Sequence, residues 1–171
     1  QGDSGSIYTH NVSGTDSTAT DNTAYGLTAL DAITTGDNNS AFGHDALGAN
    51  TTGGENTAVG QRALATNTTA SDNVGVGHSA LESNTTGANN VAVGKNSLAA
   101  NTTAANNTAV GYDALNANTT GTNNTSVGKD SLKLNTTTSN NTAVGNQSLS
   151  KTVAADNTGV GYLALVENTT G

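Results

Sequence analysis

The segment NTAVGYDALNANTTGTN, residues 107–123, decides the fold of this chain, because close variants of it recur along almost the whole sequence. One glycine in each variant marks the recurrence. The step from Gly26 to Gly43 is repeated without change as far as Gly145, and only the last step, to Gly161, is shorter, by a single residue. The full set is Gly26, Gly43, Gly60, Gly77, Gly94, Gly111, Gly128, Gly145 and Gly161. The chain is therefore a tandem array in which each unit is one structural repeat.

Other positions recur at fixed distances from this glycine. An asparagine stands four residues before it, an apolar residue directly before it, and a leucine four residues after it, always preceded by Ala or Ser. Seven units continue with Asn-Thr-Thr, as at Asn118-Thr119-Thr120. So short a period has no room for two packed helices, and the surrounding Asn, Thr and Gly disfavour a helix longer than one turn. The period fits one coil of a β-solenoid.

The predicted fold class is therefore all-β: a β-solenoid (β-roll) of about nine 17-residue coils over residues 22–171, homotrimeric or stacked end to end. We expect the small-Val-Gly run to form a short strand with its valine turned inward, and the Ala/Ser-Leu pair to make a second inward contact after a bend. Coils about 4.8 Å apart would stack like residues on like, and nine of them would span roughly 43 Å. Stacked asparagines could then hydrogen-bond along the axis.

The two ends of the chain depart from the repeat. Residues 1–21 fit it poorly and are expected to form an irregular N-terminal cap or assembly segment, in which Tyr8, one full period before Tyr25, would begin an aromatic stack. The last unit stops in mid-pattern at residues 168–171. An open solenoid end exposes unpaired backbone groups, so we expect the chain to pair with another subunit or to belong to a longer one.

The composition excludes several classes of protein. The net charge is −8 and only five residues are Lys or Arg, which argues against binding nucleic acid through its phosphates. No apolar run approaches the length needed for membrane insertion, and the absence of cysteine excludes disulfides and thiol chemistry. Polar, low-complexity chains are often disordered, but this one has no proline, few charges and a strict repeat, so we expect order.

The segment Asn107–Leu115 resembles the head repeats of YadA-type trimeric autotransporter adhesins, which run roughly Asn-Ser-Val-Ala-Ile-Gly-x-x-Ala. It is more similar still to Asn-Thr-Ala-Val-Gly-Tyr-x-Ala-Leu arrays in bacterial surface proteins and phage tail-fibre-like proteins. The resemblance covers about residues 22–171 and implies a β-roll, often homotrimeric, that is extracellular, at a cell surface or in a phage fibre. The adhesin repeat is usually shorter, and neither a stalk nor a membrane anchor is seen, so anchoring and host adhesion do not carry over.

A calcium ladder is the sharpest chemical hypothesis. The invariant asparagine and the residue before it place hard oxygen donors in every coil, and such donors suit Ca²⁺. The alternative is a ladder of hydrogen-bonded asparagine turns without metal. The candidate ligands are Asp21, Asn22, Asn38, Asn39, Glu55, Asn56, Asp72, Asn73, Asn89, Asn90, Asn106, Asn107, Asn123, Asn124, Asn140, Asn141, Asp156 and Asn157.

Other chemistry finds less support in the sequence. His44 and His78 share the column after the glycine but lie two coils apart, roughly 10 Å, too far to share one zinc ion. With no convergent acid, base and nucleophile, we expect no enzyme. The Asn-Thr-Thr triplets fit the pattern for N-linked glycans. Their threonines form two columns, which make ice binding an alternative function. The columns are Thr51, Thr68, Thr85, Thr102, Thr119 and Thr136, then Thr52, Thr69, Thr86, Thr103, Thr120 and Thr137.

Two functions remain. The first is a structural subunit of an extracellular fibre or filament that assembles with copies of itself by stacking of coils. Each unit offers only one valine and one leucine as large apolar residues, so association would bury more apolar surface. The second is an adhesin-like or ice-binding surface module, whose variable column after the glycine would contact the ligand.

Overall fold

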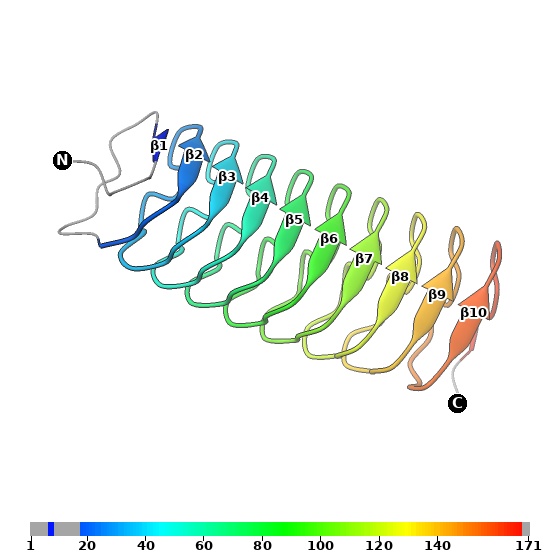
Figure 1. Ribbon diagram of the computed structural model, residues 1–171. Coiled ribbons are helices and arrows are strands. Elements are labelled where there is room, and N and C mark those ends of the chain that lie inside the picture. The colour runs from blue at the N-terminus through cyan, green and yellow to red at the C-terminus, as the bar shows by residue number, and fades with distance from the viewer. Residues whose placement is uncertain (1–6, 9–17, 169–171) are drawn as a thin grey trace.

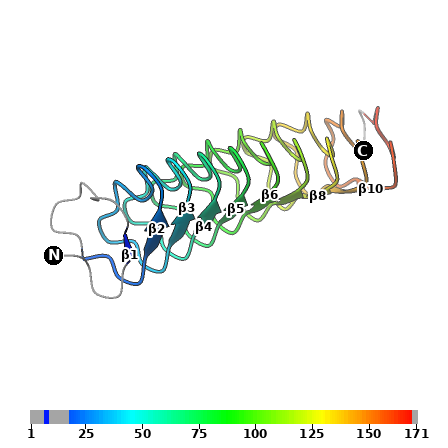
Figure 2. The same ribbon diagram turned by 90° about the horizontal axis from the view of Figure 1, so that it is seen from above.

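The chain forms a rod of stacked coils, all-β and without a helix in the part that the structure describes, which is residues 7–8 and 18–168 of a computed structural model (Figure 1). One short strand from each coil joins a single parallel sheet whose order follows the sequence. Seen from above, the coils still form one row (Figure 2). The strands are β1 (Ile7–Tyr8), β2 (Thr23–Tyr25), β3 (Ser40–Phe42), β4 (Thr57–Val59), β5 (Val74–Val76), β6 (Val91–Val93), β7 (Thr108–Val110), β8 (Thr125–Val127), β9 (Thr142–Val144) and β10 (Thr158–Val160).

The register of the sheet confirms the predicted stacking of equivalent residues. Between β7 and β8, for example, Thr108 pairs with Thr125 and Val110 with Val127, one repeat along. The shortened unit keeps the same register, since Thr142 pairs with Thr158. The missing residue is therefore absorbed in the turn between coils, and the sheet continues without interruption.

The half of each coil that lies outside the strand is also bonded along the rod. After the glycine the chain makes successive turns, in which Ala114 N–H donates to Gly111 O and Asn118 N–H to Leu115 O. The Leu115 N–H donates to Ser131 O of the next coil at 2.9 Å. Main-chain hydrogen bonds thus connect neighbouring coils at the turns as well as in the sheet.

The recurring glycine is required by its backbone and by the closeness of the next coil. Gly111 has φ 139°, which side-chain-bearing residues rarely adopt. A Cβ atom there would lie only 2.6 Å from the carbonyl oxygen of Gly128 in the following coil. The stacking distance therefore leaves no room for any other residue at this position.

The expectation that the valine turns inward is wrong. In β4, Ala58 is fully buried while Val59 is 38% exposed, and the other coils repeat this pattern. Residues alternate in direction along a strand, so burial of Asn56 forces Ala58 inward and the residues on either side of it outward. The space inside suits only a small residue: a Cβ atom on Gly75, the equivalent position in β5, would lie 3.3 Å from the Leu64 side chain.

The predicted leucine column is buried, with Leu64, Leu98 and Leu115 all 0% exposed, except in the last coil, where Leu165 is 50% exposed. Together with the inward alanines it forms a narrow apolar core along the rod. The leucines of all nine repeats have left-handed backbones, with φ between 47° and 53°. That conformation costs roughly 1–2 kcal/mol for an ordinary residue, so burial of the side chain has to offset it.

At the N-terminal end, β1 extends the sheet by pairing with β2. Its register sets Tyr8 beside Ala24 rather than beside Tyr25, so the predicted aromatic stack is wrong by one residue. The rest of the expected cap up to residue 17, like the last three residues 169–171, lies outside the described residues.

Candidate functional site

The most distinctive surface of the rod is the outward side of the sheet, which we call the outer strand face. It consists of the first and third residues of β2 to β10, whose middle residues point inward. The first column is Thr23, Ser40, Thr57, Val74, Val91, Thr108, Thr125, Thr142 and Thr158. The third-residue column is Tyr25, Phe42, Val59, Val76, Val93, Val110, Val127, Val144 and Val160. None of these residues is charged, although the chain carries a net charge of −8.

The two long edges of the outer strand face differ in charge. The residue three before the middle of each strand is exposed, and this edge bears the carboxylates of Asp21, Glu55, Asp72 and Asp156 and no basic residue. The residue three after the middle is also exposed, and this edge bears His44, His78, Lys95 and Lys129 and no acidic residue. We call them the acidic edge and the basic edge. On the basic edge, the Lys129 ammonium lies 5.9 Å from the centre of the Tyr112 ring.

The acidic edge contains half of the candidate calcium ligands: Asp21, Asn38, Glu55, Asp72, Asn89, Asn106, Asn123, Asn140 and Asp156. Each of these residues is exposed and has a left-handed backbone, with φ between 57° and 61°. Among the residues that the structure describes, no group of three His, Cys, Asp or Glu side chains is placed to hold a metal ion. Calcium binding at this edge stays a prediction.

The other half of the candidates, Asn22, Asn39, Asn56, Asn73, Asn90, Asn107, Asn124, Asn141 and Asn157, form the expected hydrogen-bonded ladder inside the rod. Asn90 Oδ1 accepts from the main-chain N–H of Asn107 in the next coil at 3.0 Å, and Asn107 Oδ1 accepts from that of Asn124 at 2.9 Å. The Asn107 Nδ2 donates to Gly121 O at 2.9 Å. These amide oxygens are therefore already engaged by the protein.

A second asparagine ladder, absent from the sequence-based expectations, runs along the Asn-Thr-Thr turns. Asn101, which is fully buried, donates from Nδ2 to Asn84 Oδ1 and to Ala104 O, both at 2.9 Å. Its own Oδ1 accepts from Asn118 Nδ2 at 3.0 Å. The signal in the sequence was the constant spacing of these asparagines, which equals that of the first ladder. The ladder ends at Thr152, whose Oγ1 is the one buried side-chain polar atom without a partner in the described residues.

The second ladder bears on the predicted glycans and on ice binding. The Nδ2 atom that a glycan would occupy is, in Asn67 and Asn84, buried and already donating two hydrogen bonds. In the first threonine column the hydroxyl is also used inside the rod, since Thr102 Oγ1 donates to Thr119 O of the next coil at 3.2 Å. Only the second threonine column, which includes Thr103, is exposed in every coil.

His44 and His78 are exposed on the basic edge and separated by a whole coil, as the spacing predicted. The asparagine and edge residues lie in continuous columns along the rod.

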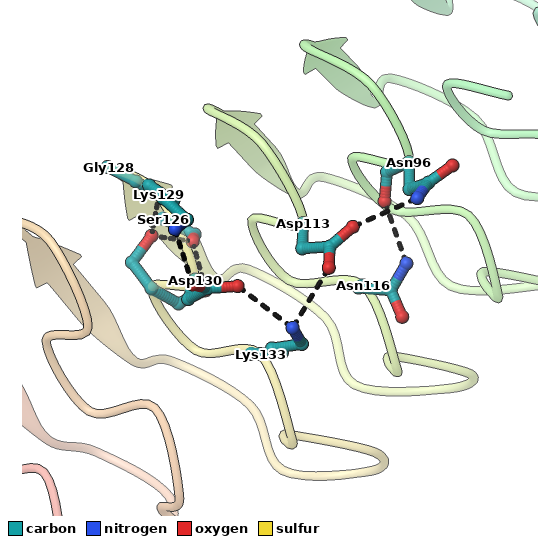
Figure 3. A network of polar contacts seen from close by, with 9 residues as sticks. Asn96, Asp113, Asn116, Ser126, Gly128, Lys129, Asp130 and Lys133 are labelled. Atoms are coloured by element: carbon teal, nitrogen blue, oxygen red, sulfur yellow. Dashed lines mark hydrogen bonds and ion pairs between the residues drawn. The ribbon is translucent and has the colours of Figure 1, made fainter. Parts of the chain in front are cut away.

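One polar network interrupts the regularity (Figure 3). Lys133 Nζ lies 2.9 Å from Asp113 Oδ2 and 2.9 Å from Asp130 Oδ1, and so links carboxylates of two successive coils. Asn96 of the preceding coil donates to Asp113 Oδ1 at 3.0 Å. Burial opposes ionisation of Asp113, but the hydrogen bonds from Lys133 and Asn96 and the charges of Lys133 and Lys95 outweigh it and lower its pKa. The hydrogen bonds to Asp113 and Asp130 in turn raise the pKa of Lys133. The network ties three coils together.

No protein-family model, curated protein or solved structure matches this chain. Within the described residues no helix is long and apolar enough to cross a bilayer. The function has to be inferred from the rod, its two ladders and the outer strand face.

Proposed function

We propose that this chain is a structural subunit of an extracellular fibre or filament, a stiff rod that assembles with copies of itself. The observation that carries the proposal is the pair of asparagine ladders, which join each coil to the next through buried side chains. In such a solenoid each coil contacts only its neighbours, so length is added without a change of cross-section. A repeated sequence is then an economical way to make a long, uniform object.

The residues that fill the interior support a stiff structural rod. Its large apolar side chains are almost all from a single column of leucines, and the remaining space is filled by alanine and by hydrogen-bonded asparagine. A buried polar network that is fully satisfied is rigid and specifies one arrangement. Bending or opening the rod would break several hydrogen bonds at once, which also favours resistance to proteases.

The composition supports an extracellular setting. The chain has no Cys, Met or Trp, so it lacks the side chains most easily oxidised outside the cell. Its net charge of −8 keeps separate rods soluble, while the uncharged outer strand face leaves one surface free for association.

The length of the rod can be tested by removing whole coils. Deletion of residues 73–123 takes out three complete repeats and joins Asp72 to Asn124 in phase. The rod length measured by small-angle X-ray scattering should fall from roughly 43 Å to roughly 29 Å for the repeats, with an unchanged cross-section. A control deletion of residues 73–119 joins the coils out of phase and should lose the β-structure seen by circular dichroism.

Assembly is tested on the intact chain by negative-stain electron microscopy over a range of protein concentrations. Fibres of constant width, several rods long, are the expected result at the higher concentrations. Single rods at every concentration would refute assembly by stacking, and a compact particle whose length does not follow the number of coils would refute the rod itself.

A further inference from the structure

We propose that two copies of this chain pair laterally, outer strand face against outer strand face, about a two-fold axis that runs along the rods. The rods would then lie side by side and point the same way. The inference rests on the proposed structural function and adds to the end-to-end stacking of coils a second, lateral contact between two copies.

The first argument is the character of the outer strand face. Its two columns contain only Thr, Ser, Val, Tyr and Phe, and its aromatic end is well exposed, with Tyr25 at 64% and Phe42 at 42%. Nine strands of three residues give a flat area of about 43 by 10 Å, or roughly 430 Å². This area is comparable to the largest apolar patches on monomeric proteins, which are often functional.

The second argument is the period of the face. Its side chains repeat once per coil, at the roughly 4.8 Å spacing of neighbouring strands. A second copy has the identical period, so the side chains of two copies can stay in register along the full length without accumulating mismatch. A partner with any other period would fall out of register within a few coils.

The third argument is self-complementarity of shape. A two-fold axis along the rod, passing over the middle residue of each strand, sets the first column of one copy against the third-residue column of the other. Phe42, one of the two bulkiest residues of the face, would then meet the partner's Ser40, the smallest. Tyr25 would meet the partner's Thr23, and Val76 would meet the partner's Val74.

The fourth argument is charge, and it selects the direction of the rods. The same two-fold axis sets Asp72 opposite the partner's His78, which lie three residues before and after the middle of β5, and sets Lys95 and Lys129 opposite the uncharged Asn89 and Asn123 of the partner. Rods pointing in opposite directions, with their central coils aligned, would set Lys95 against the partner's Lys95 and Asp21 against the partner's Asp156. Like charges facing each other across an interface are unfavourable, so the parallel arrangement is favoured.

The area indicates a dimer of modest affinity. The strands alone supply roughly 430 Å² per copy, and contact at both edges would about double this figure. A standard interface buries about 800 Å² per partner. Two flat faces cover each other completely, whereas three flat faces around one axis meet only near their edges, so we expect pairs.

The oligomeric state is tested with two matched double variants of the full chain. Val76→Lys with Val110→Lys places two ammonium groups per copy on the outer strand face, two coils apart. Thr69→Lys with Thr103→Lys makes the same change of net charge in the exposed threonine column, outside the sheet. At concentrations below those at which fibres form, sedimentation equilibrium should show a dimer for the parent and for the threonine variant. The dissociation constant of the valine variant should be at least about 100-fold higher, because its ammonium groups would lie in the interface. A 100-fold change corresponds to about 2.8 kcal/mol.

The direction of the rods is tested by spin labels at Thr52→Cys and, separately, Thr103→Cys, both outside the sheet in a chain that has no other cysteine. In the parallel dimer the distance between the two labels of a pair is the same for both sites. In an antiparallel dimer, Thr103 lies in the central coil and Thr52 three coils away, so the labels at Thr52 are displaced by about 29 Å along the rod.

The outcomes separate this inference from the proposed function. A parent chain that is rod-shaped yet monomeric, or trimeric, overturns the pairing and leaves the rod intact. A valine variant that remains dimeric, with circular dichroism unchanged, also overturns it. Unequal label distances overturn the parallel direction. A parent without β-structure would overturn the rod and the pairing together.

Discussion

Replacing Asn101 by aspartate should be among the most damaging single-atom changes in this rod. The substitution exchanges the Nδ2 group for an oxygen of nearly the same size, so no cavity is made. Asn101 is fully buried, and its Nδ2 donates at 2.9 Å to both Asn84 Oδ1 and Ala104 O. Aspartate removes both donors and leaves these two acceptors facing an additional oxygen.

The expected loss can be worked from these contacts. A buried polar group left without its partner costs about 1–3 kcal/mol, so two of them give about 2–6 kcal/mol before any charge is considered. Ionisation is opposed by burial and by the neighbouring oxygens, so the pKa of the new carboxyl in the folded chain should lie above its unfolded value. The folded state then holds the proton more tightly than the unfolded state, and the loss of stability grows as the pH rises. Below about pH 4 the carboxyl is protonated in both states and can donate one hydrogen bond, so part of the loss is recovered.

The matched control is Asn106→Asp, which makes the same change of charge at an exposed position five residues away. Its effect should stay within about 0.5 kcal/mol of the parent. Both variants are unfolded with urea at pH 7 and at pH 3, followed by circular dichroism, with hydrogen exchange to show whether coils next to the substitution open first. The reasoning is refuted if Asn101→Asp is within about 1 kcal/mol of Asn106→Asp at pH 7, or if the difference between them does not narrow at pH 3.

Four further outcomes are expected. Gly111→Ala should destabilise the rod by more than about 3 kcal/mol, because the new Cβ atom would clash with the next coil. Gly161→Ala has no described atom within 4 Å of the new Cβ, so it should cost only the backbone strain of roughly 1–3 kcal/mol. Urea unfolding compares the stability of the two variants. Thr152→Val removes the buried hydroxyl without a partner and should raise stability by about 1 kcal/mol, seen as a higher Tm. Lys133→Met should lower the free energy of unfolding by about 1 kcal/mol at pH 7. Because the pKa of Asp113 is lowered in the folded chain, the stability that the ion pair contributes is present above the unfolded pKa near 3.9 and is lost as the pH falls. The urea unfolding curves of parent and variant should therefore converge below about pH 3. Addition of EDTA should leave the Tm unchanged, since the inner asparagine oxygens are occupied by hydrogen bonds; a fall in Tm would instead favour the calcium ladder.

The inner structure of the rod was partly predictable, and the errors have a common cause. The ladder that includes Asn107 followed from its position in every unit, since identical residues at a constant spacing have to stack in a solenoid. The ladder that includes Asn101 has the same spacing, but its asparagines precede two threonines and were interpreted as a turn. The valine was placed inside because it is apolar. Burial of the asparagine four residues before the glycine fixes the alternation of the strand, and Val110 is therefore on the outside.

The outer strand face could not be found while valine was assigned to the core. Once the alternation is known, the sequence alone gives its two columns and its two charged edges. The network around Lys133 was not foreseen, because a lysine five residues after the glycine has no equivalent in the other units and its partners lie in two different coils.

The sequence by itself determined the period, the all-β class and the parallel register, because a short repeat with constant Asn, Gly and Leu positions can satisfy all of its units only by stacking them. The tertiary structure decided which side of each strand faces inward and which backbone each leucine adopts. Leu115 has φ 50°, a conformation that its own preference opposes, and it is held there by burial between adjacent coils. Such choices depend on the width of the interior and on the coil above and below, and neither exists until the chain has folded.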